Sequence, residues 1–293
     1  SAKKWLKMFW VPLYTSLASF LLSLDAFIVT LFAFSSLPLS LWRAALTFTT
    51  IVGYSTELAS ALYPKLLSGG SEQDVETSFK LVLMFVIPSA IGALILAEPL
   101  LRIFKREFVE AAIILRVNVL AVVLTCVLGI LNSVIIGTEK VDTEDATFKK
   151  LLKSRLFLLP TLSYVRALMY LPAICVISAF IVNLSLEPVY LNLPLACSWI
   201  GLFSLIPVFA YEYMLAKKIL PFHFPVQSLA KYSLASVVLA GVTILFHSRT
   251  AVQTMTSIFL GAFAYFSVLF IIDRDTRQLI ASIISTFKLR NQK

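Results

Sequence analysis

The chain has 293 residues, of which 59% are hydrophobic and 14% are charged, and it carries a formal net charge of +9. A soluble domain has about 25% charged residues, so the composition argues against a soluble globular enzyme, a disordered protein and a disulfide-stapled secreted module. Together with a mean hydropathy of +0.90, it predicts an integral membrane protein.

Eight apolar stretches are long enough to cross a membrane as helices. A spanning helix needs about 20 apolar residues, and uninterrupted apolar runs favour helices over the alternating strands of a barrel. The predicted fold class is therefore all-α integral membrane, with eight transmembrane helices and a first span that is not a cleaved signal peptide. In chain order the predicted spans are residues 9–34, 38–67, 79–101, 109–136, 156–184, 189–216, 226–247 and 253–272.

The distribution of lysine and arginine predicts the orientation of the chain. Of the 25 Lys and Arg residues, eighteen fall on the inner side if the N-terminus is cytoplasmic, and Arg116 and Arg166 lie within spans. The outer side holds five, namely Arg43, Arg102, Lys105, Arg106 and Arg249. We therefore predict a multi-pass protein of the cell (plasma) membrane with both termini in the cytoplasm. Topology accounts for the basic balance, which implies no nucleic-acid partner.

Two cytoplasmic segments are predicted to form helices outside the membrane. The segment from Thr138 to Arg155 combines alternating acidic residues with a lysine-rich end, which indicates a short capped helix. After Asp273, apolar residues recur at helical spacing with basic residues mostly opposite, which is typical of an interfacial amphipathic helix. These apolar residues are Leu279, Ile280, Ile283, Ile284 and Phe287.

Three charged residues lie deep inside predicted spans. At about 1.5 Å of rise per residue, Asp25 lies roughly 24 Å from the cytoplasmic end of its helix, whereas Glu57 and Arg166 both lie about 15 Å from theirs. A charge at mid-bilayer costs about 2.5 to 3.5 kcal/mol, so it needs a partner or water. Opposite charges at equal depth predict that Glu57 and Arg166 pair. The pair is either a fixed structural contact or one that an anionic head group opens by competing for Arg166.

Polar residues also form a stripe along the second span. Spacings of 4, 3, 4 and 3 place Arg43, Thr47, Thr50, Tyr54 and Glu57 on one helix face. Such a stripe indicates either a hydrated cavity or a polar seam between helices, and we favour the cavity. The fourth span repeats the pattern with smaller residues, for which a seam is the simpler interpretation. Those residues are Asn118, Thr125, Gly129 and Asn132.

The sequence shows no catalytic or metal-binding pattern of histidine and cysteine residues. Cys126, Cys175 and Cys197 lie in apolar runs without CxxC spacing, and His223 and His247 are far apart. We therefore predict no catalytic residue, no metal site and no cofactor.

Several motifs resemble the lipid-linked oligosaccharide flippases of the MATE-like (MOP) superfamily, of the polysaccharide-biosynthesis Wzx and MurJ types. They are Asp25, the run Ala61-Leu62-Tyr63-Pro64-Lys65-Leu66-Leu67-Ser68, Pro88, the run Glu98-Pro99-Leu100-Leu101-Arg102-Ile103-Phe104, and the stretch from Phe108 to Lys140. The resemblance is best over residues 20–140. It implies the second of two six-helix lobes, followed by two extra helices. The implied division is 1–218 for the lobe, 219–272 for the extra helices and 273–293 for the cytoplasmic tail.

The resemblance also implies a function. It is translocation of a polyprenyl-phosphate-linked oligosaccharide by alternating access, in contact with membrane lipid and with a first-lobe partner chain or a second copy supplying the other wall. Arg43 and Arg166 would attract phosphate or anionic sugar, and Thr50, Tyr54 and Glu57 would line the same cavity. The alternatives are one half of a MATE-type drug/cation exporter, which would need an acidic cavity, and a non-transporting structural half or fragment.

Some members of the resembled family hold Na⁺ with an acid in the helix that matches the first span. Asp25 fits that element and is the candidate for ion coupling. The fifth span has no Asp or Glu and contains Arg166 instead. The sequence therefore does not support a Na⁺ site, and we expect Asp25 to pair with protein or to titrate.

Overall fold

The computed structural model describes residues 10–60, 62–139, 154–246, 250–273 and 276–277, and within these residues it is helical without strands. The predicted all-α class is thus confirmed for the described residues. The elements are α2 (Trp10–Ser23), α3 (Asp25–Ala33), α4 (Leu37–Gly53), η1 (Tyr54–Ala59), α5 (Leu62–Leu67), α6 (Glu72–Ile95), α7 (Ala97–Phe104), η2 (Arg106–Ala111), α8 (Ala112–Gly137), α10 (Arg155–Asn183), α11 (Val189–Ile219), α12 (Val226–Leu245) and α13 (Ala251–Ile272).

Seven helical stretches in the described residues are long and apolar enough to span a membrane: Pro12–Ala33, Glu72–Ile95, Arg106–Gly137, Arg155–Asn183, Val189–Ile219, Val226–Leu245 and Ala251–Ile272. The chain is a multi-pass membrane protein. The remaining predicted span, 38–67, consists of α4, the 3₁₀ segment η1 and α5. Eight continuous spanning helices are therefore not confirmed, because the polar sequence after Gly53 tightens this path into 3₁₀ geometry.

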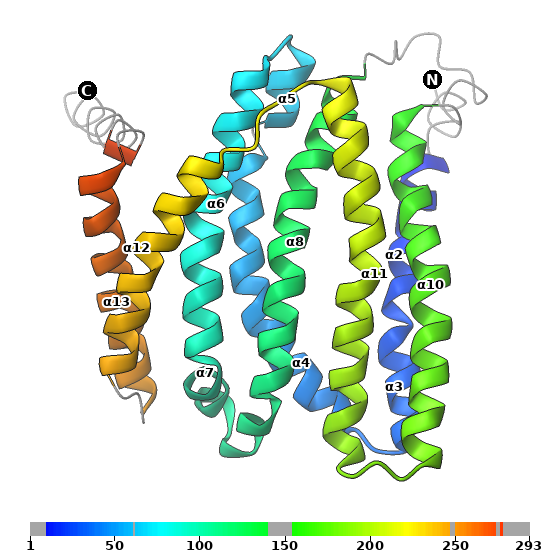
Figure 1. Ribbon diagram of the computed structural model, residues 1–293. Coiled ribbons are helices and arrows are strands. Elements are labelled where there is room, and N and C mark those ends of the chain that lie inside the picture. Colours follow the sequence, from blue (N-terminus) through cyan, green and yellow to red (C-terminus); the bar gives the residue numbers. More distant parts are fainter. Residues whose placement is uncertain (1–9, 61, 140–153, 247–249, 274–275, 278–293) are drawn as a thin grey trace, which may run out of the picture.

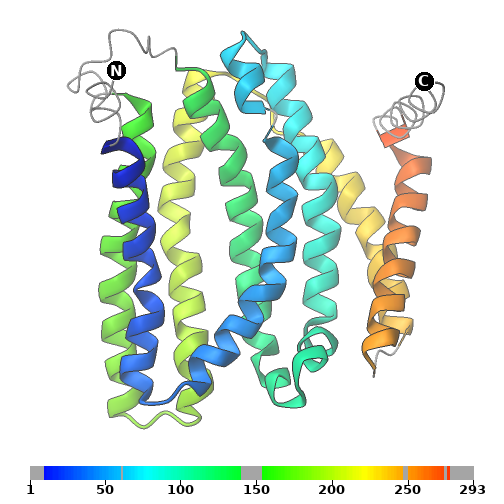
Figure 2. The same ribbon diagram turned by 180° about the vertical axis from the view of Figure 1, so that it is seen from behind.

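Helix α8 forms the centre of the bundle and packs against α4, α6 and α11 (Figures 1 and 2). Its apolar residues are buried around most of its circumference, with Ile114, Leu115, Ile130, Leu131 and Ile135 each at 0–1% exposure. A helix that is apolar all round belongs in a core. η1 can approach α8 closely because Gly129 has no side chain. A Cβ at that position would overlap Thr56 Cγ2 on η1.

Helices α12 and α13 form a hairpin beside α6, on the side away from α10 (Figure 1). A proline explains one of its attachments. Pro88 lies inside α6 and has no N–H to donate to the carbonyl of Met84, four residues earlier. The fully buried Tyr265 of α13 donates its hydroxyl to that carbonyl at 2.7 Å instead. A membrane helix tolerates proline when a neighbour satisfies the freed carbonyl in this way.

A second attachment joins the two helices of the hairpin to each other, at the end where α12 begins and α13 ends. Lys231 Nζ of α12 donates to Asp273 Oδ1 at 3.0 Å, just beyond the end of α13. The other carboxylate oxygen of Asp273 accepts from the backbone N–H and the hydroxyl of Thr276. Burial raises the pKa of Asp273, but the hydrogen bonds from Lys231 and Thr276 outweigh it and leave this pKa below its ordinary value.

The connections alternate between the two ends of the bundle (Figures 1 and 2). The start of α2, the turn between α5 and α6, the start of α10, the end of α11 and the end of α13 share one end. These are segments predicted to be cytoplasmic, but which side of the membrane they occupy stays a prediction. The division at residues 218 and 272 also stays a prediction. The predicted helix within 138–155 and the amphipathic tail fall mostly outside the described residues.

Candidate functional site

A polar cavity of about 240 Å³ lies among α3, α4, α8, α10 and α11. Its wall contains two of the three deep charges, Asp25 and Arg166, together with the buried Tyr170. Asp25 comes from the first predicted span and Arg166 from the fifth, and these two spans are far apart in the sequence. The cavity is therefore assembled by tertiary packing.

Asp25 sits at a break in the first span, where α2 ends and α3 begins. Its Oδ1 accepts the backbone N–H of Ala26 at 2.6 Å, and its Oδ2 accepts the Tyr170 hydroxyl at 3.1 Å. A carboxylate in the first turn of a helix is also favoured by the helix dipole. These contacts stabilise a negative charge that would be costly among apolar side chains.

Arg166 contacts Tyr170 and does not form a direct ion pair with Asp25. Its Nε donates to Ser204 Oγ at 3.2 Å, and its guanidinium carbon is 5.9 Å from the centre of the Tyr170 ring. Arg166 and Asp25 are near enough to attract each other electrostatically, without being in contact. The tyrosine thus connects the two charges, with its ring toward the cation and its hydroxyl on the anion.

The predicted pairing of Glu57 with Arg166 is wrong. Glu57 lies on η1 with its side chain exposed, whereas α10 packs against α11, α2 and α3. Equal depth along two helices does not make their side chains meet, because the rotation of each helix and its neighbours are also needed. The opposite charge that shares a cavity with Arg166 is that of Asp25.

Two buried donors in the cavity wall have no hydrogen-bond partner in the part of the chain that the structure describes. They are Trp42 Nε1 and Asn118 Nδ2, on residues 4% and 8% exposed. An unsatisfied buried donor costs about 1–3 kcal/mol, and a cavity of this size has room for several waters. Water in the polar cavity would therefore satisfy these two donors. Hydration was predicted for the stripe of the second span, and the cavity is a second place that favours water.

The polar stripe of α4 and η1 faces away from the other helices of the chain. Arg43, Thr47, Thr50, Tyr54 and Glu57 are all exposed, Tyr54 to 65%. A polar seam between these five residues and the rest of the described chain is therefore excluded. In α8, by contrast, Asn118 is buried and Gly129 meets Thr56 of η1, as expected for a seam, while Thr125 is exposed.

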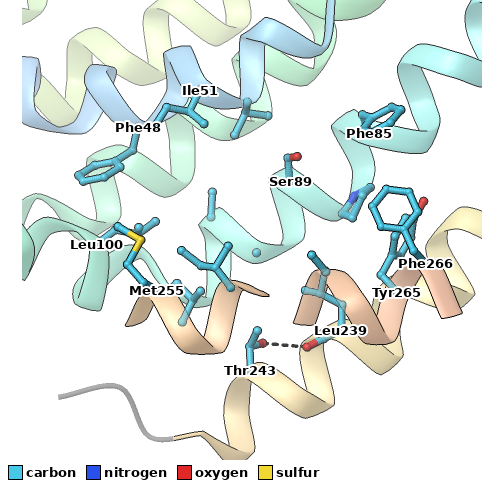
Figure 3. Close-up of a pocket in the computed structure, with 17 residues that line it drawn as sticks. Phe48, Ile51, Phe85, Ser89, Leu100, Leu239, Thr243, Met255, Tyr265 and Phe266 are labelled. Carbon is cyan, nitrogen blue, oxygen red and sulfur yellow. Dashed lines mark hydrogen bonds between the residues drawn. The ribbon is translucent and has the colours of Figure 1, made fainter. Parts of the chain in front are cut away.

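An apolar cleft of about 340 Å³ lies between the bundle and the α12–α13 hairpin (Figure 3). Phe48 and Ile51 line it from α4, Phe85 and Ser89 from α6, and Leu239, Met255 and Phe266 from the hairpin. The Thr243 hydroxyl in its wall donates to the carbonyl of Leu239 in its own helix. The cleft therefore offers almost no polar group and suits hydrocarbon. We did not predict it from the sequence, although Ser89, Gly92 and Ala93 on one face of α6 were a usable signal.

Helix α4 borders all three features. With about 3.6 residues per turn, Phe48, Ile51 and Val52 fall on one flank of the polar stripe, and Trp42, Leu46 and Thr49 fall on the other. The first set lines the apolar cleft and the second lines the polar cavity. The exposed stripe therefore runs between a hydrocarbon-lined cleft and a charged cavity.

A further buried acid lies elsewhere. Glu212 of α11 is 4% exposed, and its Oε2 has no hydrogen-bond partner among the described residues. We did not single it out from the sequence. Only the tertiary structure shows that it is covered.

No protein-family model and no curated protein sequence matches the chain. The chain is, however, similar to one solved structure, a lipid II flippase MurJ in an inward closed conformation, with a TM-score of 0.59 and 16% sequence identity. The match covers 86% of this chain and 52% of that one. The chain thus spans about half the length of the flippase and shares its fold over that half.

Proposed function

We propose that this chain is one half of a flippase that translocates a polyprenyl-phosphate-linked oligosaccharide by alternating access. Such a substrate has a long hydrocarbon tail and a charged, hydroxyl-rich head. A protein that moves it needs an apolar surface and a polar surface side by side. The likeness in fold to a lipid II flippase over half of that protein supports the same proposal.

The observation that carries the proposal is the division of faces on α4. Its apolar flank lines the cleft, and its exposed polar stripe begins directly beside that flank. A lipid with its tail in the cleft would have its head within reach of the stripe. Arg43 would attract the phosphate, since guanidinium binds phosphate in a bidentate manner. Thr50, Tyr54 and Glu57 would offer hydrogen bonds to sugar hydroxyls.

The proposal also requires a second wall. The stripe is exposed, so this chain supplies only one side of a cavity that must close around the head group. We propose that a first-lobe chain or a second copy of this chain supplies the other side, and that the two rock against each other as in other alternating-access carriers. Arg166 lies in the internal cavity instead of on this wall, so its part in head-group binding would be indirect.

Deletion of the gene tests the proposal in the source cell. We expect the lipid-linked sugar to accumulate in the cytoplasmic leaflet and surface glycan to decrease. Normal surface glycan in a deletion strain without a paralogue would contradict the proposal.

Variants then test the cleft and the stripe separately in the complemented strain. Gly92→Leu should fill the cleft and reduce flipping, because Gly92 lines it and an added Cβ meets nothing within 4 Å. Gly241→Leu is the matched control, since its Cβ is equally free but Gly241 does not line the cleft. Arg43→Gln should weaken head-group binding, whereas Arg102→Gln, a change at another exposed arginine, should not. Equal effects of a variant and its control would contradict the assigned role.

A further inference from the structure

We infer that Arg166 acts as a tethered cation for Asp25, so that the lobe takes up no Na⁺ at this carboxylate, and that removing the guanidinium converts the polar cavity into a monovalent-cation site. The inference concerns the ion chemistry of the cavity and does not depend on which substrate the protein moves. Its basis is the set of side chains that share the polar cavity with Asp25.

The hydroxyl groups of the cavity wall present oxygen lone pairs. Thr49 donates its proton to the carbonyl of Leu46 at 2.8 Å, and Ser198 donates to the carbonyl of Pro194 at 2.9 Å. Thr125 likewise donates to its own helix. A hydroxyl that has used its only proton can act only as an acceptor toward the cavity. With the carboxylate of Asp25, these groups make the wall attractive to a cation.

The cation that the chain itself places there is the guanidinium of Arg166. It shares the cavity with Asp25 and is held by Ser204 and the ring of Tyr170. Ser204 in turn donates to the carbonyl of Gly201, so its oxygen is oriented to accept from Arg166. Arginine stays charged at any relevant pH, so a metal ion approaching Asp25 would meet a permanent positive charge inside the same cavity.

The acidic groups do not favour a metal ion over the arginine. Among the described residues lining the cavity, Asp25 is the one acid. No group of three or more His, Cys, Asp or Glu side chains forms a ligand cluster in the described residues. One carboxylate balances one cation, and Arg166 already supplies that charge. The residues present therefore do not fit Na⁺, and the fit is restored only if the guanidinium is removed.

Purified full-length protein in detergent tests this inference by thermal unfolding and by direct binding of radioactive Na⁺, in NaCl against choline chloride at equal ionic strength. Wild type should unfold at the same temperature in both salts and bind no Na⁺. Arg166→Met keeps an unbranched apolar stem without the charge, and it should gain an increase of several degrees in NaCl together with Na⁺ binding. Arg166→Lys is the matched control, and it should behave as wild type because it keeps the cation.

The double variant Asp25→Asn/Arg166→Met should lose the gained Na⁺ response, which assigns it to Asp25. Arg166→Gln serves as a second uncharged variant if Arg166→Met does not fold. Na⁺ binding to wild type that disappears in Asp25→Asn would overturn the inference. It would also be overturned if neither uncharged variant folds in NaCl, or if a folded one shows no Na⁺ response. Failure of the proposed flipping would leave these measurements unchanged, so the two hypotheses are tested independently.

Discussion

Replacing Tyr265 with phenylalanine should loosen the α12–α13 hairpin from α6. The Tyr265 hydroxyl donates at 2.7 Å to the carbonyl of Met84, whose intrahelical donor is missing because residue 88 is proline. Tyr265 is 0% exposed, so water cannot replace the lost hydrogen bond without a local opening.

The magnitude follows from the burial of the carbonyl. Leaving a buried acceptor unsatisfied costs about 1–3 kcal/mol, whereas the phenylalanine ring keeps the packing. For a chain of this size, 1 kcal/mol corresponds to roughly 2–4 °C in unfolding temperature. We therefore expect Tyr265→Phe to lower the apparent Tm in detergent by about 2–12 °C.

The reason for the effect can be isolated with a second substitution. Pro88→Ala restores the backbone N–H that can reach the Met84 carbonyl, so Tyr265→Phe should cost at least about 1 kcal/mol less in the Pro88→Ala background. Tyr211→Phe is the matched control, because Tyr211 is 43% exposed on α11. It should leave the apparent Tm unchanged.

Two results would refute this reasoning. One is a Tyr265→Phe protein as stable as the Tyr211→Phe control. The other is an equal cost of Tyr265→Phe with proline and with alanine at position 88, which would show that the hydroxyl does not act through the carbonyl freed by Pro88.

Two further predictions concern other contacts. Gly129→Ala should lower the apparent Tm relative to Gly241→Ala by an amount equivalent to about 1–3 kcal/mol, because only the Cβ added at position 129 overlaps Thr56 Cγ2. Adding Thr56→Ser to Gly129→Ala should restore the apparent Tm, and no restoration would exclude the overlap as the cause. Because the pKa of Asp273 is lower in the folded state, its contacts stabilise the fold above about pH 4 and this contribution is lost as the pH falls through the folded value. Apparent Tm measured from pH 7 downward should therefore fall less steeply in acid for Asp273→Asn than for wild type, and parallel profiles would contradict the role of the carboxylate.

The positions of most membrane helices could be predicted from the sequence because they are a local property. A run of about 20 apolar residues must satisfy its own backbone hydrogen bonds in lipid, and only a helix does so within one segment. The second span shows the limit of this reasoning. It was predicted as one span, yet the chain changes to 3₁₀ geometry at Tyr54, where the polar sequence after Gly53 begins and Thr56 packs on Gly129.

The deep charges could be identified from the sequence, but their partners could not. Helical rise gives the depth of Glu57 and Arg166, while the tertiary structure decides how each helix is rotated and which helix it faces. Arg166 consequently shares a cavity with Asp25 and Tyr170, and Glu57 stays exposed on η1.

The sequence by itself determined that this is an all-helical membrane protein, that polar residues form a stripe on its second span, and which charges lie at depth. Only the tertiary structure decided that the stripe faces outward between a charged cavity and an apolar cleft. The cleft is built from α4, α6, α12 and α13 together, and no single segment carries the information for a space that exists only between packed helices. The physical reason is that a membrane constrains each helix along its own axis, whereas side-chain packing between helices sets what each face meets.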